Sequence, residues 1–466
     1  MIPILEKDES SPREDGVSVA RRQSVDQVGI SNMSPSVYIG MTADILHHGH
    51  VNIIAKGRTL GEVTIGLLTD AAVAGHKRLP LLKWEHRKQV LENIAGVARV
   101  VPQETWDYAP NLLRYRPEYM VHGTDWLQGP LAPYRARALA ALESFGGRLI
   151  EIPYTEGVSS TEMAERQQAL GTTPDLRRAT LRRLLAAKPV SRFIEAHSPI
   201  SAMIAEHSRI EAGDQIREFD GFWSSSLTDS IVRGKPDIEA IEINSRLTTI
   251  NEIFEVTTKP LIIDADTGGK VEHFELNVRS MERLGVSGAI IEDKTGLKRN
   301  SLFGAEVAQT QEAIPAFCDK IRAGRAARVR DDFMVIARIE SLILKKGMAD
   351  AMQRAEAYGE AGVDGVMIHS CAHTPDEVYE FARLFRQSFD YLPLVAVPTS
   401  YNQTSEAELE AHGFNIVIYA NHLMRAAYPA MRRAAETILR HGRTSELDGE
   451  LIGIQDLLEL IPGTRE

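Results

Sequence analysis

The fold of this chain is most tightly constrained by its second half, where short apolar runs recur with helical patterns between them. After Val190 eight such runs follow one another: RFIEAH, DGFWSSS, PLIIDAD, GAIIED, MVIARIE, GVMIHS, LVAVPTS and NIVIYAN. Strands that alternate with helices form parallel sheets. Eight strand–helix units in succession predict a closed (β/α)8 barrel over residues 191–440.

Most of these runs end in polar or charged residues. In a barrel of this kind the carboxyl ends of the strands form one face, and that face carries the active site. The strand ends supply His197, Trp223, Asp264, Asp266, Glu292, Asp293, Arg338, His369 and Asn421. Such a concentration of polar and reactive side chains at one face predicts an enzyme rather than a scaffold.

The first half of the chain has the pattern of an open α/β sheet. From Ser36, VYIG and EVTIGLLT are typical of buried strands, and HGHVNIIAKGRTLG between them is typical of a helix that ends at glycine. Further helices are predicted at residues 84–94 and 133–145, and further strands at 99–101, 119–122 and 148–152. This pattern predicts a Rossmann-like domain over residues 36–165.

Three further segments flank or join the two domains. Residues 1–35 are rich in Ser, Asp, Glu and Arg, which predicts a mobile tail. Residues 166–190 contain a basic helical pattern, which predicts a linker helix whose arginines form a solvated face. Residues 441–466 are predicted to be a C-terminal tail.

Composition excludes several classes of function. There are 53 Lys and Arg residues against 64 Asp and Glu, a net charge of −11, which argues against a protein that binds nucleic acid or anionic membranes. The two cysteines, Cys318 and Cys371, stand in no metal-binding spacing. The first residues lack the apolar core of a signal peptide, and we therefore expect a cytoplasmic protein.

A first candidate site lies where the first predicted strand turns into the first helix. Here the residues from Asp44 read DILHHGH. The free backbone N–H groups at a helix start attract anions. Two imidazoles, His47 and His50, could stabilise the charge that develops on a phosphate under attack. On the tetrapeptide alone, a surface loop without chemistry is an equally good interpretation.

Three further motifs follow predicted strands or precede helices: HKRLPLLKWEHRK, MVHGTDW and YTEGVSSTEM. With HHGH, this series resembles the glycerol-3-phosphate cytidylyltransferase family of the nucleotidyltransferase superfamily. The family's HxGH, EHRK, G(D/T)DW and TEG(I/V)S(S/T)T signatures match at residues 47–50, 85–88, 123–126 and 155–161.

The resemblance implies a role for each matched residue. His47 and His50 would stabilise the transition state, and Lys77 would neutralise the triphosphate. The implied nucleotide-binding residues are Thr42, Asp44, Arg87, Gly123, Asp125, Trp126, Ser159, Ser160 and Thr161. Two departures, MTAD where the family has GTFD and Tyr154 where it has arginine, leave the acceptor substrate open.

A second candidate site lies at the predicted barrel mouth. Asp264 and Asp266 leave one strand and Glu292 ends the next, which together offer the hard oxygen ligands that Mg²⁺ prefers. A lone DxD is more often a helix cap or a solvated pair than a metal site, and the position of these residues at two adjacent strand ends favours the metal. The loop that follows, EDKTGLKRNS at residues 292–301, contains a glycine that could act as the hinge of a lid.

This loop matches EDKxxxxxNS and resembles phosphoenolpyruvate mutases of the isocitrate lyase superfamily. The resemblance covers residues 193–440 and includes EAH, FWSSSL, DADTG, ARIE, HS and ANH. It implies that Asp264 binds Mg²⁺ while Asp237, Asp266 and Glu292 hold its waters. The other implied residues are Arg338, His369, Asn300 and Lys298 as catalytic groups and Trp223, Ser224, Ser225, Ser226 and Ser301 as pocket residues.

Lyases of this superfamily carry a catalytic cysteine in the lid loop. No cysteine occurs between Glu292 and Ser301, which argues against cleavage of a carbon–carbon bond. Ser400 stands where mutases often have lysine, and phosphonopyruvate hydrolases share much of the site. A hydrolase barrel therefore stays an alternative, together with a CTP-sensing or glycerol-3-phosphate cytidylyltransferase N-terminal domain.

The pairing of the two domains resembles the bifunctional enzymes of fosfomycin biosynthesis. It implies that the barrel converts phosphoenolpyruvate to 3-phosphonopyruvate and that the N-terminal domain transfers CMP from CTP to a phosphonate, 2-hydroxyethylphosphonate being the expected acceptor, with Mg²⁺ at both sites. The superfamily implies a homodimer or homotetramer. Direct channelling between the sites does not follow, since other reactions must intervene.

Overall fold

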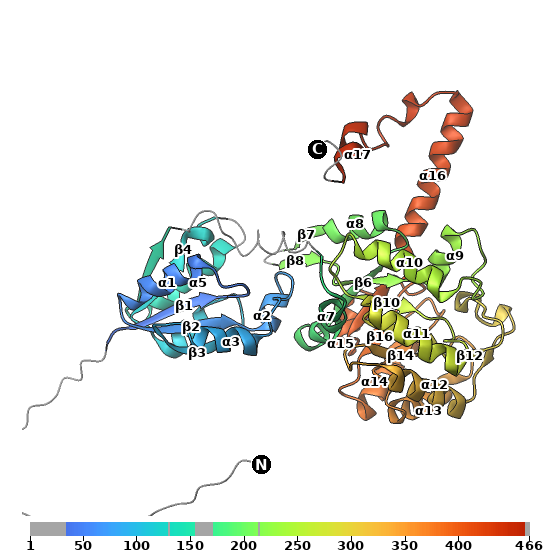
Figure 1. Ribbon diagram of the computed structural model, residues 1–466, viewed down its shortest axis with the longest axis horizontal. Helices are drawn as coiled ribbons and strands as arrows, with labels where there is room; N and C mark the ends of the chain where they lie inside the picture. The colour runs from blue at the N-terminus through green and yellow to red at the C-terminus, as the bar shows by residue number, and fades with distance from the viewer. Residues whose placement is uncertain (1–33, 129–130, 154–170, 213–214, 462–466) are drawn as a thin grey trace, which may run out of the picture.

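The computed structural model describes residues 34–128, 131–153, 171–212 and 215–461. Figure 1 shows an N-terminal α/β domain, a barrel domain, and a long helix, α16 (His422–His441), that projects from the barrel. Most of the expected N-terminal tail, residues 1–33, lies outside the described residues.

The N-terminal domain is built on a parallel sheet with the order β3-β2-β1-β4-β5. Its strands are β1 (Ser36–Met41), β2 (Glu62–Leu68), β3 (Val97–Gln103), β4 (Tyr119–Gly123) and β5 (Arg148–Ile152). Val37 and Ile39 of β1 pack with Ile65 of β2 in the core. All five predicted strands are present, because continuous apolar runs suit strands covered on both faces.

Helices cover this sheet on its two faces. They are α1 (His48–Arg58), α2 (Asp70–Ala74), α3 (Trp84–Glu92), α4 (Ala109–Tyr115) and α5 (Ala132–Glu143), with the short η1 (Thr124–Trp126) after β4. Helix α1 begins directly after His47, so its N-terminus lies at the carboxyl edge of the sheet.

The second domain is a closed barrel with the order β10-β11-β14-β15-β16-β17-β6-β9. The eight barrel strands are β6 (Ser191–Glu195), β9 (Gly221–Ser224), β10 (Leu261–Asp264), β11 (Gly288–Glu292), β14 (Met334–Ile339), β15 (Gly365–Ile368), β16 (Leu394–Ala396) and β17 (Ile416–Tyr419). Every one of the eight apolar runs forms a strand, so the predicted barrel is confirmed.

Helices and short hairpins connect the barrel strands. The helices are α8 (Pro199–His207), α9 (Ser226–Val232), α10 (Ile243–Phe254), α11 (Val271–Leu284), α12 (Ile314–Ala327), α13 (Gly347–Glu360), α14 (Asp376–Ser388) and α15 (Glu406–Ala411). The hairpin β7 (Arg209–Ala212) and β8 (Gln215–Glu218) follows α8. After α16 come η4 (Ser445–Leu447) and α17 (Ile454–Glu459).

Helix α7 (Pro174–Ala187) closes the amino end of the barrel, and this corrects the prediction of a linker helix with solvated arginines. Leu181 is buried among interior residues of the barrel strands. Arg177 and Arg178 are 4% and 3% exposed and donate to the backbone carbonyls of Thr257 and Glu282. These arginines are buried because each guanidinium donates to a backbone carbonyl in the segment that precedes β10 or β11.

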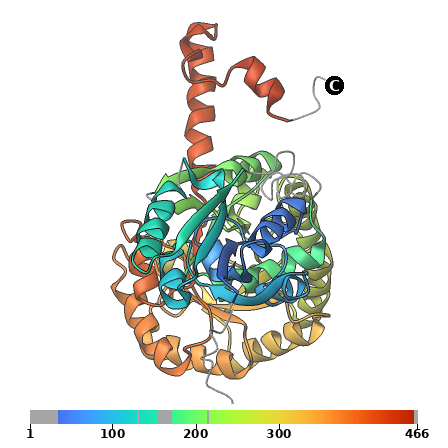
Figure 2. The same cartoon turned by 90° about the vertical axis from the view of Figure 1, so that its left-hand side faces the viewer.

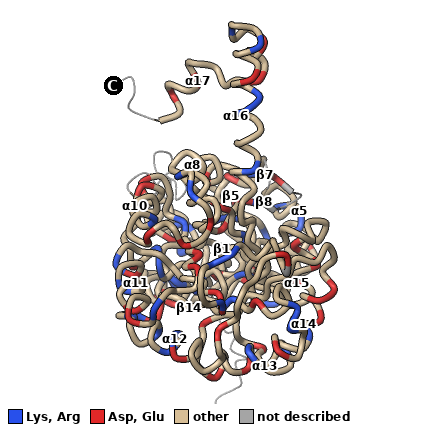
Figure 3. The backbone as a smooth tube through the Cα atoms, turned by 90° about the vertical axis from the view of Figure 1, so that its right-hand side faces the viewer, with Lys and Arg blue, Asp and Glu red and all other residues tan. Residues whose placement is uncertain are grey.

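The N-terminal domain lies at this same end of the barrel. In Figure 2 it stands in front of the ring of barrel helices, and α2 contacts α7. Figure 3 shows the opposite end, where helices α10 to α15 surround the barrel and acidic and basic residues interleave. The carboxyl ends of the barrel strands therefore face away from the N-terminal domain.

A lid segment covers the carboxyl face of the barrel between β11 and α12. It contains β12 (Lys294–Thr295), η3 (Ser301–Glu306) and β13 (Thr310–Gln311), and β12 pairs with β13 in an antiparallel ladder. Gly296 has φ = +81°, which suits glycine at the turn of this segment. The buried Asp293 at its base accepts bonds from Gln311, Arg354 and Tyr358.

Candidate active sites

The two histidines of the N-terminal site are oriented by the backbone of the first helical turn. His47 caps α1, and its Nδ1 accepts a bond from the Gly49 N–H at 3.1 Å. Nδ1 of His50 accepts from the His47 N–H at 3.4 Å, and the two ring centres lie 4.1 Å apart. Because both Nδ1 atoms accept, each neutral ring carries its proton on Nε2 and can donate from there.

The electrostatics of the helix start keep these rings neutral. Burial, with the charges of His47 and Lys77, lowers the pKa of His50 to about 4, and burial also lowers the pKa of His47. At pH 7 both imidazoles are therefore hydrogen-bond donors at the positive end of α1. Such donors suit an anionic phosphate that gains charge during a reaction.

Other predicted nucleotide residues lie around the same edge. The Lys77 ammonium is 5.3 Å from the centre of the Trp106 ring, with the carboxylates of Asp44 and Asp125 as charged neighbours. Asp125 is exposed, and its carboxylate is 3.6 Å from Nδ1 of His122. The structure thus brings Lys77, Asp44, Asp125 and the two histidines to one edge of the sheet.

Two predicted nucleotide-binding residues are buried beneath this edge instead of being open to a ligand. Arg87 is 1% exposed and donates to the carbonyls of Thr42, Leu68 and Leu82 and to Asp70. Its guanidinium is thereby committed to holding the backbone of the site.

Trp126 is also 1% exposed. Its ring stacks on His122 with centres 3.7 Å apart, and its Nε1 donates to Glu151 at 2.8 Å. It therefore supports the turn that contains Gly123 and Asp125 from inside the core. Ser159, Ser160, Thr161 and Tyr154 lie outside the described residues.

At the barrel mouth the lid lysine lies among the predicted metal residues. Lys298 is 4% exposed, and its Nζ donates to Ser226 Oγ at 2.5 Å, to Asp237 at 3.0 Å and to Asp266. Asn300 donates to Asp237 at 2.7 Å. The lid is therefore closed on the mouth, and the lysine compensates the charge of the carboxylates.

The resemblance implies one direct ligand to Mg²⁺, Asp264, with Asp237, Asp266 and Glu292 holding its waters. Within the described ranges, no three His, Cys, Asp or Glu side chains converge as a metal centre. The buried carboxylates of the mouth need a counter-charge, and the ammonium of Lys298 supplies it. Burial opposes ionisation of Asp264, but the charges of Lys298, Arg338 and Arg246 outweigh it and lower its pKa.

The residues nevertheless fit a magnesium ion with a water shell. Both oxygens of Glu292 are buried and accept no hydrogen bond from the described residues, although Lys294 and Arg338 lie 3.3 Å away. Burial raises the pKa of Glu292 to about 7. Buried oxygens without donors are suited to the water ligands of a cation, and carboxylates are the ligands that Mg²⁺ favours.

A cationic group faces these carboxylates across the mouth. Arg338 donates from Nη2 to Ser301 Oγ at 2.6 Å and contacts Nδ1 of His369 at 2.9 Å, and its Nε donates to Glu340 at 2.5 Å. Ser301 in turn donates to Glu340 at 2.5 Å. The lid is thus bonded directly to Arg338, and through Arg338 it is connected to His369, the second residue predicted to hold a phosphoryl group.

The predicted pocket residues on β9 and α9 are buried next to the carboxylates. Ser226 donates to Asp264 at 2.7 Å, Ser224 donates to Asp229 at 2.9 Å, and Ser225 directly precedes α9. Trp223 is 2% exposed, and among the described residues its indole N–H has no acceptor.

Three residues of this site were not predicted from the sequence. Arg246 of α10 is 2% exposed and donates to Asp229, to Ser224 and to Asp266. Glu340 binds Arg338, as described above. Glu340 follows strand β14 in the ARIE motif, and its position at a strand end could have indicated a site residue. Arg246 and the third residue, Asp229, lie in helices, where no sequence pattern distinguishes them from other charged residues.

A cavity of about 800 Å³ lies beside the lid at the same face. Phe303, Lys345, Cys371, His373 and Ser400 are among its lining residues. Ser400, which stands where mutases often have lysine, therefore borders open space next to the lid.

Comparison with known sequences identifies the barrel. The phosphoenolpyruvate phosphomutase profile matches residues 181–439, more than half of the chain. The chain belongs to the phosphoenolpyruvate phosphomutase family. A cytidylyltransferase-like profile matches residues 38–166, which gives the N-terminal domain its class. The two matches support an enzyme with isomerase and nucleotidyltransferase domains.

Individual relatives agree with this family. The chain is 38% identical over 267 residues to a phosphonopyruvate hydrolase from Variovorax sp. (strain Pal2), covering 57% of this chain and 88% of the relative. It is 35% identical over 278 residues to a phosphoenolpyruvate phosphomutase from Streptomyces hygroscopicus, covering 59% of this chain and 82% of the relative. Both alignments leave a large part of this chain without a counterpart.

Solved structures of the family share the barrel. A phosphoenolpyruvate phosphomutase from Streptomyces platensis subsp. rosaceus superimposes with a TM-score of 0.55 at 36% identity, covering 61% of this chain and 94% of that one. A phosphonopyruvate hydrolase in complex with oxalate and Mg²⁺ superimposes with a TM-score of 0.54 at 35% identity, covering 62% of this chain and 95% of that one. Separately, no helix among the described residues has the length and apolarity needed to cross a membrane.

Proposed function

We propose that the chain is a bifunctional enzyme of phosphonate biosynthesis. The barrel would isomerise phosphoenolpyruvate to 3-phosphonopyruvate, and the N-terminal domain would transfer CMP from CTP to a phosphonate with release of pyrophosphate. The observation that carries the barrel assignment is the closed lid, in which Lys298, Asn300 and Ser301 contact the barrel mouth. The lid loop, residues 292–301, contains no cysteine.

In the barrel reaction the phosphoryl group leaves the enol oxygen and forms a bond to the methylene carbon of the same molecule. Arg338 and His369 would bind the phosphoryl oxygens, and Asn300 would steady the group during transfer. The closed lid would exclude water, which would otherwise hydrolyse the group. Lys298 would hold the lid shut against the acidic mouth.

Magnesium fits this proposal as a resident ion. Asp264 would hold it, and Asp237, Asp266 and Glu292 would hold its waters. When bound, Mg²⁺ would stabilise negative charge on the carboxylate and enolate oxygens of the substrate. We expect chelation to abolish the reaction and added Mg²⁺ to restore it.

In the N-terminal reaction a phosphonate oxygen would attack the α-phosphorus of CTP, and the bond to pyrophosphate would break. Nε2–H of His47 and of His50 would donate to the phosphate as charge develops, and Lys77 would bind the triphosphate. Magnesium on the triphosphate is part of this proposal. The orientation of both rings by backbone N–H groups supports it.

The proposed acceptor is 2-hydroxyethylphosphonate, and the pairing of the two domains supports it. A phosphonate made from the barrel product would then be the acceptor substrate of the nucleotidyltransferase domain. This is what the resemblance of the domain pairing to the enzymes of fosfomycin biosynthesis implies. The same proposal includes the limits of the nucleotidyltransferase domain given from the sequence, residues 36–165, a cytoplasmic location, and a homodimer or homotetramer.

The test of the N-terminal assignment is pyrophosphate release from CTP with 2-hydroxyethylphosphonate, 2-aminoethylphosphonate or glycerol 3-phosphate. We expect 2-hydroxyethylphosphonate to be preferred and His47→Ala to reduce turnover about 10²- to 10³-fold. The matched control is His48→Ala, because His48 is exposed on the first turn of α1. A preference for glycerol 3-phosphate would contradict the shared pathway, and no release would favour a CTP sensor.

The test of the barrel is ³¹P NMR of the chain with phosphonopyruvate and Mg²⁺. The mutase assignment predicts phosphoenolpyruvate as the product. Formation of pyruvate and inorganic phosphate would instead identify a hydrolase, an outcome that the Variovorax relative makes worth measuring.

A further inference from the structure

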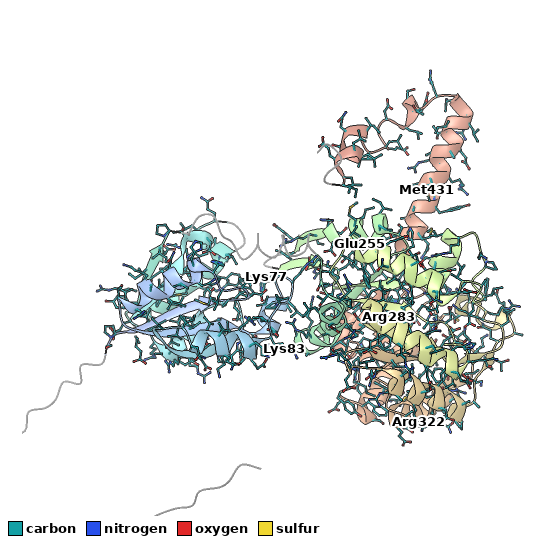
Figure 4. All side chains as sticks on the ribbon, in the orientation of Figure 1. Lys77, Lys83, Glu255, Arg283, Arg322 and Met431 are labelled. Carbon is teal, nitrogen blue, oxygen red and sulfur yellow. The ribbon has the colours of Figure 1, made fainter. Side chains whose placement is uncertain are left out.

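One loop of the N-terminal domain contacts both the candidate nucleotide site and the barrel domain. We call residues 75–83 the Lys77 loop. It follows α2 and ends at Lys83, the residue that precedes α3. Figure 4 shows Lys77 and Lys83 on the side of the domain that faces the barrel. The loop therefore carries the predicted triphosphate-binding residue at the junction of the two domains.

The barrel domain holds the backbone of this loop through Arg183. Its Nη2 donates to the Pro80 carbonyl at 2.6 Å, and its Nη1 donates to the Leu81 carbonyl at 3.1 Å. Nη2 also lies 3.7 Å from the carboxylate of Asp70 in α2. Arg183 belongs to α7, which is fixed to the barrel by the buried Leu181.

The side chain next to Lys77 makes a second connection. Arg78 donates to Glu206 at the end of α8 and to Thr258 Oγ1 at 3.4 Å, and its Nε lies 3.8 Å from Glu218 in β8. Glu206 is fixed on the barrel side, because it is 4% exposed and also accepts a bond from Thr257 at 2.8 Å.

The same loop is bonded directly to the candidate site. The Leu82 N–H donates to Oδ1 of Asp44 at 3.2 Å, and the Leu82 carbonyl accepts from Nε of Arg87 at 3.1 Å. Arg87 also donates to the carbonyl of Thr42, beside Asp44. A displacement of the loop would therefore move both Lys77 and the backbone next to Asp44.

We propose that Arg78 and Arg183 are positioning residues for the nucleotidyl transfer, so that the barrel domain completes the N-terminal site by fixing the Lys77 loop. This proposal rests on the proposed cytidylyltransferase function. If the loop is free to move, only a fraction of molecules presents Lys77 correctly, and the apparent affinity for CTP falls by that fraction. The bonds at the reacting phosphorus are unaffected, so the effect belongs to KM more than to kcat.

The experiment compares Arg78→Ala and Arg183→Ala in the full chain with Arg182→Ala. Arg182 is the neighbour of Arg183 on α7, but it contacts the Asp331 carbonyl and Asp364 of the barrel instead of the loop. Pyrophosphate release gives KM for CTP and kcat, and hydrogen exchange of residues 76–83 reports the order of the loop. Barrel turnover is measured in parallel.

We expect each of the two test variants to raise KM for CTP roughly three- to tenfold, the net effect of losing one ordinary hydrogen bond. Exchange in residues 76–83 would be faster, kcat would change less than twofold, and barrel turnover would stay at the wild-type level. Arg183→Lys would have a KM for CTP between those of the wild type and Arg183→Ala, because an ammonium can still donate to one carbonyl.

The proposal is overturned if KM and exchange in Arg78→Ala and Arg183→Ala equal those of Arg182→Ala. It is also overturned if kcat falls while KM and exchange stay unchanged. If the wild-type chain releases no pyrophosphate, the proposed function fails, but exchange in residues 76–83 and equilibrium binding of CTP still test the anchoring.

Discussion

At the scale of single residues, the structure satisfies buried charges with partners on other helices, strands and loops. Arg246 shows this most clearly, since it connects Asp229, Ser224 and the loop of Asp266 behind the barrel mouth. Removal of one member of such a group leaves the others charged, buried and unpaired.

We therefore predict that Arg246→Met lowers the free energy of unfolding of the barrel by about 3–5 kcal/mol. The control is Arg283 of α11, which is exposed, and Arg283→Ala should change the free energy of unfolding by less than about 0.5 kcal/mol. Hydrogen exchange of β9 and β10 under increasing urea measures both. Equal stabilities of the two variants would show that Arg246 makes no net contribution.

A second residue-scale prediction concerns the pH dependence set by His50. Its pKa is lowered to about 4 by burial and neighbouring charges, whereas an unperturbed histidine has a pKa of about 6.5. Between these values the unfolded chain binds a proton that the folded chain does not. The stability contributed by neutral His50 is thus complete above pH 6.5 and is lost as the pH falls towards 4.

NMR titration of the His50 ring, assigned with the His50→Gln variant, should give a midpoint below pH 5.5. The variant should also lose less stability than the wild type between pH 6.5 and pH 4.5. A midpoint near 6.5 would mean that the ring is solvated and can be charged near neutrality.

At the scale of elements, the lid and α7 each do more than connect their neighbours. The lid brings Lys298, Asn300 and Ser301 from one short segment onto three different strand ends or loops. Leu297, beside Lys298, is exposed on the lid. The lid thus has an inner side that contacts the site and an outer side that does not.

We predict that Lys298→Ala lowers barrel turnover at least about 100-fold, because the lid would close less often and charge would be lost at the site. The pyruvate formed per turnover should rise, since water can enter an open site. Leu297→Ala is the control and should retain turnover within about twofold. The ³¹P NMR assay measures both, and unchanged product ratios in Lys298→Ala would argue against exclusion of water by the lid.

At the scale of the whole molecule, the two candidate sites lie at opposite ends of the barrel. The Lys77 loop contacts residues before β9 and β10, such as Glu218 and Thr258, whereas the lid covers the carboxyl ends of the strands. This geometry gives no short path between the sites. We therefore expect the two reactions to run independently.

Oxalate with Mg²⁺, which is bound in the related hydrolase structure, provides a probe of this independence. We expect oxalate to inhibit the barrel reaction, and at inhibitory concentrations KM for CTP should stay within about twofold of its value without oxalate. Conversely, CTP should not change barrel turnover. A change in barrel kinetics with CTP would contradict independence and favour a sensor domain.

The sequence alone determined the eight barrel strands, the five-stranded sheet and the lid motif, because these follow from local periodicity and contiguous residues. The tertiary structure decided which charges are buried and against what. Arg183 meets Leu81 across 102 positions and Lys298 meets Asp237 across 61. Distant partners also explain why the arginines of α7 were wrongly predicted to be solvated, since Arg177 meets Thr257 across 80 positions and Arg178 meets Glu282 across 104. The burial of Arg87 and Trp126 likewise depends on how the sheet and its helices pack. A charged side chain has no local signature of its partner, since that partner is brought near only when the chain folds.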